Sequence, residues 1–139
     1  MLRRILYTSR AMPGITMKDV YDIIRVSHNR NSQCGITGGL LFIDGHFIQM
    51  MEGLPASIDT RFEKIRQDGR HQDIVIRQET DVVTPVFCDD WMALRDGSKI
   101  DPSVLATHGY VPSLPIDQFD GERVLQFLLA CFEQESVAV

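Results

Sequence analysis

Polar side chains occur at positions where the sequence pattern calls for apolar ones. Gln49 shares one face of its expected strand with Phe47 and Met51, because alternate residues of a strand point to the same side. Ser27 and Asn31 continue an apolar helical stripe that should face a sheet. Buried polar groups need partners, and an amide such as that of Gln49 can donate and accept at once. The pattern therefore indicates a polar spot between a helix and the sheet.

Each of these residues also has an ordinary structural explanation, which the residues alone favour. Gln49 could face solvent at a strand edge, and Ser27 and Asn31 could touch water in a frayed last helical turn. Tyr7 could be a core aromatic whose hydroxyl reaches the surface.

A small cationic group lies near the expected end of a second helix and consists of Lys64, Arg70 and His71. Such a group could bind a phosphate. It is equally expected as a solvated helix end, where cations interact favourably with the helix dipole.

The elements that would position these residues follow from periodicity and turn signals. Asp44-Gly45 predicts a type I′ hairpin that pairs Phe42 with Phe47 and Leu40 with Gln49. The expected strands are residues 3–9, 36–43, 47–51, 74–83 and 86–94, and the expected helices are residues 17–32 and a second helix that follows 53–55 and stops near 69. This order predicts an α+β, ferredoxin-like βαββαββ sheet with two helices on one face.

The C-terminal part reads as a loop with a short helix at 97–118, then a strongly apolar helix at 121–134. Its apolar arc is too wide for a helix that exposes one side to solvent. We expect it to pack on the other face of the sheet or at a subunit interface. The chain is accordingly divided into a domain at 1–96 and a helical extension at 97–139.

Composition excludes several classes of function. The chain has 139 residues, a net charge of -5 and a pI near 5.2, which works against binding nucleic acid. No apolar run is long enough to span a membrane, and the N-terminal apolar stretch is too short for a secretory signal. We expect a cytoplasmic protein with no nucleic-acid or membrane partner. Three widely spaced cysteines give no metal-ligand pattern.

Four segments in order resemble the BLUF family of flavin photoreceptors: LYTS at 6–9, NSQCGITGGLL at 31–41, FIQMMEG at 47–53 and IRQDGRH at 65–71. The resemblance covers about residues 2–95. It implies a flavin, FAD or FMN, between the two crossover helices.

The resemblance also implies roles for individual residues. Tyr7 would donate an electron and a proton, Gln49 would bridge the tyrosine hydroxyl and the flavin N5/O4 edge, and Asn31 would hold the other carbonyl edge of the ring. The positions that match the lining of the ring or its side chain are Ile23, Ser27, Arg30, Phe47 and Ile65. The positions that match the ribityl and phosphate region are Lys64, Asp68, Arg70 and His71.

One departure from the family concerns the last strand. The family commonly has a tryptophan two residues before its signalling methionine, whereas Trp91 directly precedes Met92 here. Adjacent strand residues face opposite sides. A bulge could keep both roles, Met92 could lie beside Gln49, or Trp91 could keep its place with Ala93 in the methionine position. We expect Met92 to lie beside Gln49.

The implied function is a sensor, not an enzyme, in which light leaves the Gln49 amide rotated or tautomerised. The signal would pass to an unidentified downstream protein effector or to an altered homo-oligomer. Two other classes stay open. An acylphosphatase-like hydrolase would need an arginine in the loop after the first strand, and Arg10 with Gly14 is a poor match. A small interaction domain would use the apolar face of the last helix.

Overall fold

The computed structural model describes residues 1–87, 90–110 and 119–135. Its strands are β1 (Leu2–Ala11), β2 (Thr37–Ile43), β3 (His46–Gly53), β4 (His71–Val82) and β5 (Ala93–Asp96). Its helices are α1 (Met17–Cys34), α2 (Pro55–Arg66), α3 (Pro102–Thr107) and α4 (Gly121–Glu135), with a 3-10 turn η1 at Gly97–Lys99. The expected element order is confirmed.

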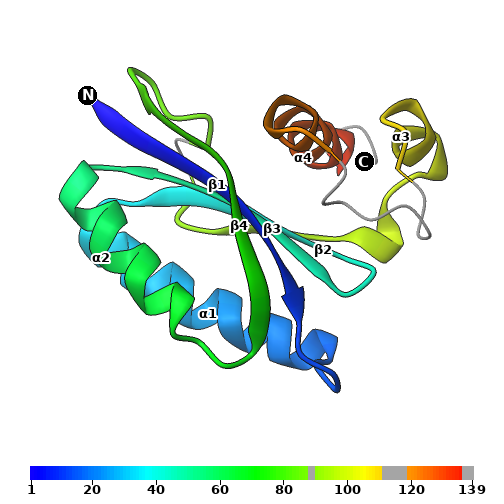
Figure 1. Cartoon of the computed structure of the whole chain (residues 1–139), viewed down its shortest axis with the longest axis horizontal. Helices are drawn as coiled ribbons and strands as arrows, with labels where there is room; N and C mark the ends of the chain where they lie inside the picture. The colour runs from blue at the N-terminus through cyan, green and yellow to red at the C-terminus, as the bar shows by residue number, and fades with distance from the viewer. Residues whose placement is uncertain (88–89, 111–118, 136–139) are drawn as a thin grey trace.

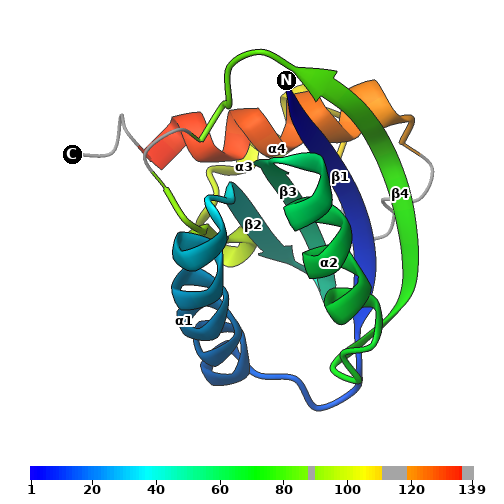
Figure 2. The ribbon, with the colours of Figure 1, turned by 90° about the vertical axis from the view of Figure 1, so that its left-hand side faces the viewer.

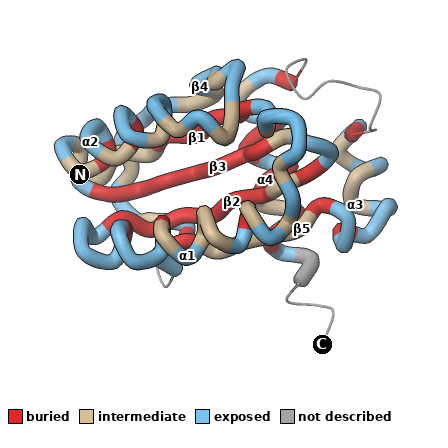
Figure 3. Tube along the Cα trace, turned by 90° about the horizontal axis from the view of Figure 1, so that it is seen from below, coloured by how far each residue is buried: buried red, intermediate tan, exposed pale blue. Residues whose placement is uncertain are grey.

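The five strands form one sheet in the order β4-β1-β3-β2-β5. Neighbouring strands are antiparallel except β2 and β5, which are parallel. The first four strands and the two crossover helices make the expected ferredoxin-like arrangement. Helices α1 and α2 cover one face of the sheet, and α3 and α4 lie on the other side (Figure 1). Central strand β3 is buried along most of its length (Figure 3).

The β2–β3 hairpin forms as the Asp44-Gly45 pair predicts. Both residues have positive φ, 47° and 78°, as a type I′ turn requires. Phe42 pairs with Phe47 and Leu40 pairs with Gln49. The turn therefore sets which residues of β3 face α1 and α2.

Helix α1 begins at a capping box, in which the Thr16 hydroxyl and the Asp19 carboxylate each accept from the other residue's backbone N–H. It ends at Gly35, whose left-handed conformation (φ 68°) closes the helix. The helix is two residues longer than expected, and both Ser27 and Asn31 are buried on it. The explanation that they lie in a frayed, wet last turn is therefore wrong.

The expected strand at 86–94 is wrong for most of its length, because β5 begins only at Ala93. Phe87 belongs to the core that contains α4, whereas Met92 belongs to the core beneath α1 and α2. The passage from β4 to β5 instead contains a turn, in which the Asp90 N–H donates to the Phe87 carbonyl at 3.1 Å. The buried Glu52 carboxylate fixes the start of this passage by accepting from the Val86 N–H (2.7 Å) and from Arg4 Nε (3.0 Å).

Helix α4 crosses the face of the sheet opposite α1 and α2 (Figure 2). Phe127 is fully buried and stacks on Tyr110 with ring centroids 5.0 Å apart, and Phe132 packs edge-on against Phe87 at 4.8 Å. The wide apolar arc is thus covered within the chain. This confirms the expectation that the helix packs on the other face of the sheet. Within the described residues, no helix has the length and hydropathy needed to cross a bilayer.

We predict that Phe127→Ala lowers the free energy of unfolding by about 3–5 kcal/mol, because a fully buried aromatic ring is removed from the core. Gln126→Ala is the matched control, since Gln126 is the exposed preceding residue, and it should change stability by less than about 0.5 kcal/mol. Urea unfolding measured by circular dichroism should show one transition in each variant. A separate early transition would show that α4 is an independent unit.

Candidate functional site

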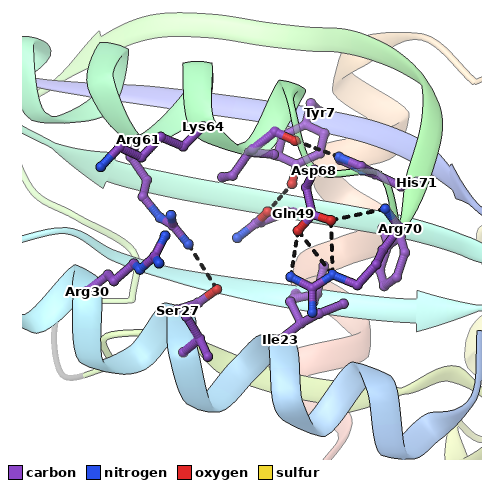
Figure 4. A pocket seen from close by; sticks show the side chains of 14 residues that line it. Tyr7, Ile23, Ser27, Arg30, Gln49, Arg61, Lys64, Asp68, Arg70 and His71 are labelled. Atoms are coloured by element: carbon purple, nitrogen blue, oxygen red, sulfur yellow. Dashed lines mark hydrogen bonds and ion pairs between the residues drawn. The ribbon is translucent and has the colours of Figure 1, made fainter.

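A hollow lies between α1 and α2 above the sheet (Figure 4). It encloses about 700 Å³, counting the space at its open mouth. Eleven of the residues expected from the sequence line it: Tyr7, Ile23, Ser27, Arg30, Phe47, Gln49, Lys64, Ile65, Asp68, Arg70 and His71. Residues predicted on the helices and residues predicted on the strands therefore line the same hollow.

The floor of the hollow carries a buried chain of hydrogen bonds. Tyr7 and Gln49 are direct cross-strand partners on β1 and β3, so both side chains point to the same face. The Tyr7 hydroxyl donates to Gln49 Oε1. At its other end Gln49 Nε2 donates to Met92 Sδ at 3.5 Å. The alternative that Gln49 faces solvent at a strand edge is wrong, because β3 is central and Gln49 is only 6% exposed.

The same observation decides between Trp91 and Met92. Met92 is buried and contacts Gln49, whereas the Trp91 side chain is 37% exposed. The expectation that Met92 lies beside Gln49 is confirmed. Trp91 contributes its backbone instead, because its carbonyl accepts from Asn31 Nδ2 at 2.8 Å.

Tyr7 is held as a neutral phenol. Its burial raises its pKa far above the ordinary value of 10.0, an effect that Arg61 offsets in part. Phe62 packs edge-on against the Tyr7 ring with centroids 5.4 Å apart. The hydroxyl reaches Gln49 and not the surface, so the ordinary explanation of Tyr7 is also wrong.

Asn31 lies beside the hollow and does not line it. Its side chain is fully buried, and while Nδ2 donates to Trp91, Oδ1 has no hydrogen-bond partner. A buried acceptor without a partner is costly. The site therefore lacks a donor that a bound molecule could supply.

At the end of the hollow near the start of β4, the polar side chains are hydrogen-bonded to other residues of the chain. Arg70 donates to both Asp68 carboxylate oxygens, at 2.9 Å and 2.6 Å. These hydrogen bonds are the main cause of the lowered pKa of Asp68. The two ring nitrogens of His71 lie 2.7 Å from Ser9 Oγ and 2.7 Å from the Ile65 carbonyl.

Three further residues line the hollow that the sequence reasoning missed: Val26, Leu40 and Arg61. Arg61 follows Ile58 by three positions and precedes Ile65 by four, so helical spacing alone could have placed it on the inward face. Leu40 is the cross-strand partner of Gln49, which the hairpin pairing already implied. Val26 follows Ile23 by three positions and precedes Arg30 by four, so helical spacing could have placed it in the same way.

Comparison with known families gives the site its context. The family model described as "Sensors of blue-light using FAD" matches residues 2–93, which contain the whole of the hollow. The chain belongs to the BLUF family. The hydrolase and plain interaction-domain interpretations are therefore displaced.

Individual relatives and structures agree with this membership. Photoactivated adenylate cyclase subunit beta of Euglena longa is 33% identical over 90 residues, which cover 65% of this chain and 10% of the relative. The chain thus spans about a tenth of that cyclase subunit's length. The dark-state structure of BlrB, a BLUF protein, is 27% identical with a TM-score of 0.74 and covers 93% of this chain and 95% of that one. The photo-activated state of BlsA has a TM-score of 0.83 over 94% of each chain at 22% identity, which shows the fold alone.

The residues that line this hollow, together with Asn31 beside it, fit a flavin. Apolar side chains of Ile23, Phe47 and Ile65 line it and can pack against a flat ring. The unpartnered Asn31 Oδ1 matches the imide N–H of such a ring, and the Gln49 amide can meet an acceptor or a donor at the ring edge.

We predict that Tyr7 forms no tyrosinate at pH 10. Ionisation of Tyr7 is measured as the difference in near-ultraviolet absorbance between the wild type and Tyr7→Phe as the pH is raised. In the protein unfolded by urea, the same difference should appear with its midpoint at about pH 10. Because the folded state holds this proton more tightly, the wild type should lose stability relative to Tyr7→Phe as the pH rises above about 10. Half-ionisation of Tyr7 in the folded protein at or below pH 10 would contradict a buried hydroxyl.

Proposed function

We propose that this chain is a blue-light sensor that holds FAD, with FMN as the alternative, in the hollow between α1 and α2. The observation that carries the proposal is the Gln49 carboxamide, buried between the Tyr7 hydroxyl and the Met92 sulfur. An amide in this position can exchange its donor and acceptor ends by rotation without any backbone movement.

The residue roles in this proposal are those that the family resemblance implies. Tyr7 is the electron and proton donor, and Gln49 links it to the reactive edge of the flavin. Asn31 holds the imide edge of the ring through Oδ1. Ile23, Ser27, Arg30, Phe47 and Ile65 surround the ring and its side chain, and Lys64, Asp68, Arg70 and His71 lie along the ribityl chain or phosphate.

Bound flavin supplies the absorption of blue light and an excited state that accepts an electron. Tyr7 would give that electron, and its hydroxyl proton would leave through Gln49 Oε1, which already accepts the Tyr7 hydrogen bond. The proton returns to Tyr7 on recombination, and the Gln49 amide is left rotated or tautomerised. If the amide rotates, its Nε2 no longer donates to Met92.

The size of the response can be bounded. One net hydrogen bond contributes about 0.5–1.5 kcal/mol. Driving a two-state element from 1:99 to 99:1 needs about 5.5 kcal/mol. The rearrangement at Gln49 alone therefore gives a modest population shift, unless several contacts of the 86–96 segment change together.

We infer that the output leaves through β5 and α4. Met92 directly precedes β5, and three residues later the Arg95 guanidinium lies 4.5 Å from the centre of the Phe132 ring on α4 and donates to the Phe132 carbonyl at 3.4 Å. A shift of Met92 would thus be felt at α4. The division of the chain at residue 96, a cytoplasmic location, a separate effector protein and a change in self-association stay predictions.

We predict that Gln49→Leu keeps the flavin but abolishes the light-induced red shift of its absorption bands, because leucine can neither donate nor accept. Visible spectra before and after blue light, followed by recovery in darkness, measure this. Gln67→Leu is the control, since Gln67 is exposed at the end of α2 and should retain the shift. A reversible shift in Gln49→Leu would sink the proposed switch.

We predict that Met92→Leu slows recovery in darkness by about two- to fivefold, the effect of losing a weak hydrogen bond of about 0.5–1 kcal/mol. The sulfur accepts from Gln49 Nε2 and so favours the starting orientation of the amide. Met51→Leu, at another buried methionine of the same core, should recover at the wild-type rate. Equal rates in all three proteins would show that Met92 acts only as packing.

A further inference from the structure

The two ends of the hollow differ in their charge balance. At one end the Arg70 guanidinium is neutralised by the Asp68 carboxylate. At the other end Arg30 of α1 and Arg61 and Lys64 of α2 come together (Figure 4). Among the ion pairs within the described residues, none involves these three cations. This end therefore carries positive charge from both helices without a carboxylate to balance it.

Arg61 is the inward member of this cationic end. One of its terminal nitrogens donates to Ser27 Oγ on α1 at 3.2 Å, and its buried Nε has no hydrogen-bond partner. Burial and then the nearby charge of Arg30 lower the pKa of Arg61, and Tyr7, Cys34 and Asp68 offset this in part. The folded chain thus holds a cation where its charge is disfavoured, with one donor still open.

We propose that Arg61, with Arg30 and Lys64, forms the subsite for the phosphate of a flavin nucleotide. A guanidinium offers two parallel donors that match phosphate oxygens, and charge-assisted hydrogen bonds of this kind are strong. A phosphate here joins α1 to α2 and balances the excess charge. This inference rests on the proposed function and moves the phosphate away from Arg70 and His71, whose donors are already used.

A flavin ring carbonyl is the competing partner for Arg61, and it differs from phosphate in charge. A neutral carbonyl would satisfy the open Nε but would leave the cations of Arg30 and Lys64 unbalanced. An anion would satisfy the open donor and would also interact favourably with the exposed cations of Arg30 and Lys64. Riboflavin and FMN share the ring and the ribityl chain and differ by the phosphate, so together they separate the two partners.

The test is a titration of the full chain, freed of flavin, with riboflavin and with FMN, followed by quenching of flavin fluorescence. The wild type should bind FMN at least about tenfold more tightly than riboflavin, and added salt should weaken FMN binding far more than riboflavin binding. Arg61→Gln keeps a donor for Ser27. It should weaken FMN binding by about 10- to 100-fold, the effect of one charge-assisted contact, and leave riboflavin binding within about threefold.

Arg66→Gln is the matched control. Arg66 lies on the same helix but does not line the hollow, so both affinities should stay at the wild-type values. Equal loss of riboflavin and FMN in Arg61→Gln, with an unchanged melting temperature, would assign Arg61 to the ring and overturn the phosphate subsite. Equal affinities of the wild type for the two flavins would overturn it while leaving the sensor intact. A wild type that binds neither flavin would overturn the proposed function as well.

Discussion

A carboxamide kept dry at the centre of the sheet is the constraint on which the rest of this structure depends. Gln49 lies on central strand β3. Burying its amide without partners would remove a large part of the small free energy of unfolding that is typical of proteins. The Tyr7 hydroxyl and the Met92 sulfur meet that need from two different strand regions. Met92 directly precedes β5, which pairs with β2, and further back the Val86 N–H is held by the buried Glu52 carboxylate. The buried amide of Gln49 thus depends on a contact with Met92, 43 positions further along the chain.

Local signals in the sequence were sufficient for most of the fold. The Asp44-Gly45 turn specified both the hairpin and the pairing of Leu40 with Gln49, and the Thr16–Asp19 box specified where α1 begins. The strand expected at 86–94 failed because β-propensity reports a preference for a pleated surface and carries no information about which face of the sheet the chain must reach. That choice is made by contacts far along the chain, such as Phe87 with Phe132.

The site was predicted less evenly than the fold. Family resemblance located Tyr7, Gln49 and the residues along both helices, but the residues alone favoured solvent for Gln49, Ser27 and Asn31. Periodicity shows that a polar residue lies on an inward face but cannot show whether a partner awaits it there. Arg61 was overlooked because an arginine on a surface helix is ordinary, and its burial depends on how close α1 comes to α2.

The pairing of Tyr7 with Gln49 is a property of the β1–β3 register, which runs without a break from Arg3 with Gly53 to Arg10 with His46. Tyr7 and Gln49 are thus held by backbone hydrogen bonds between two neighbouring strands, and no loop, terminus or outer helix sets their separation. Such a sensor is modular in a mechanical sense. Changes at the chain ends should therefore leave the pairing of Tyr7 with Gln49 in place, whereas changes to α4 can reach Gln49 through Arg95 and Met92.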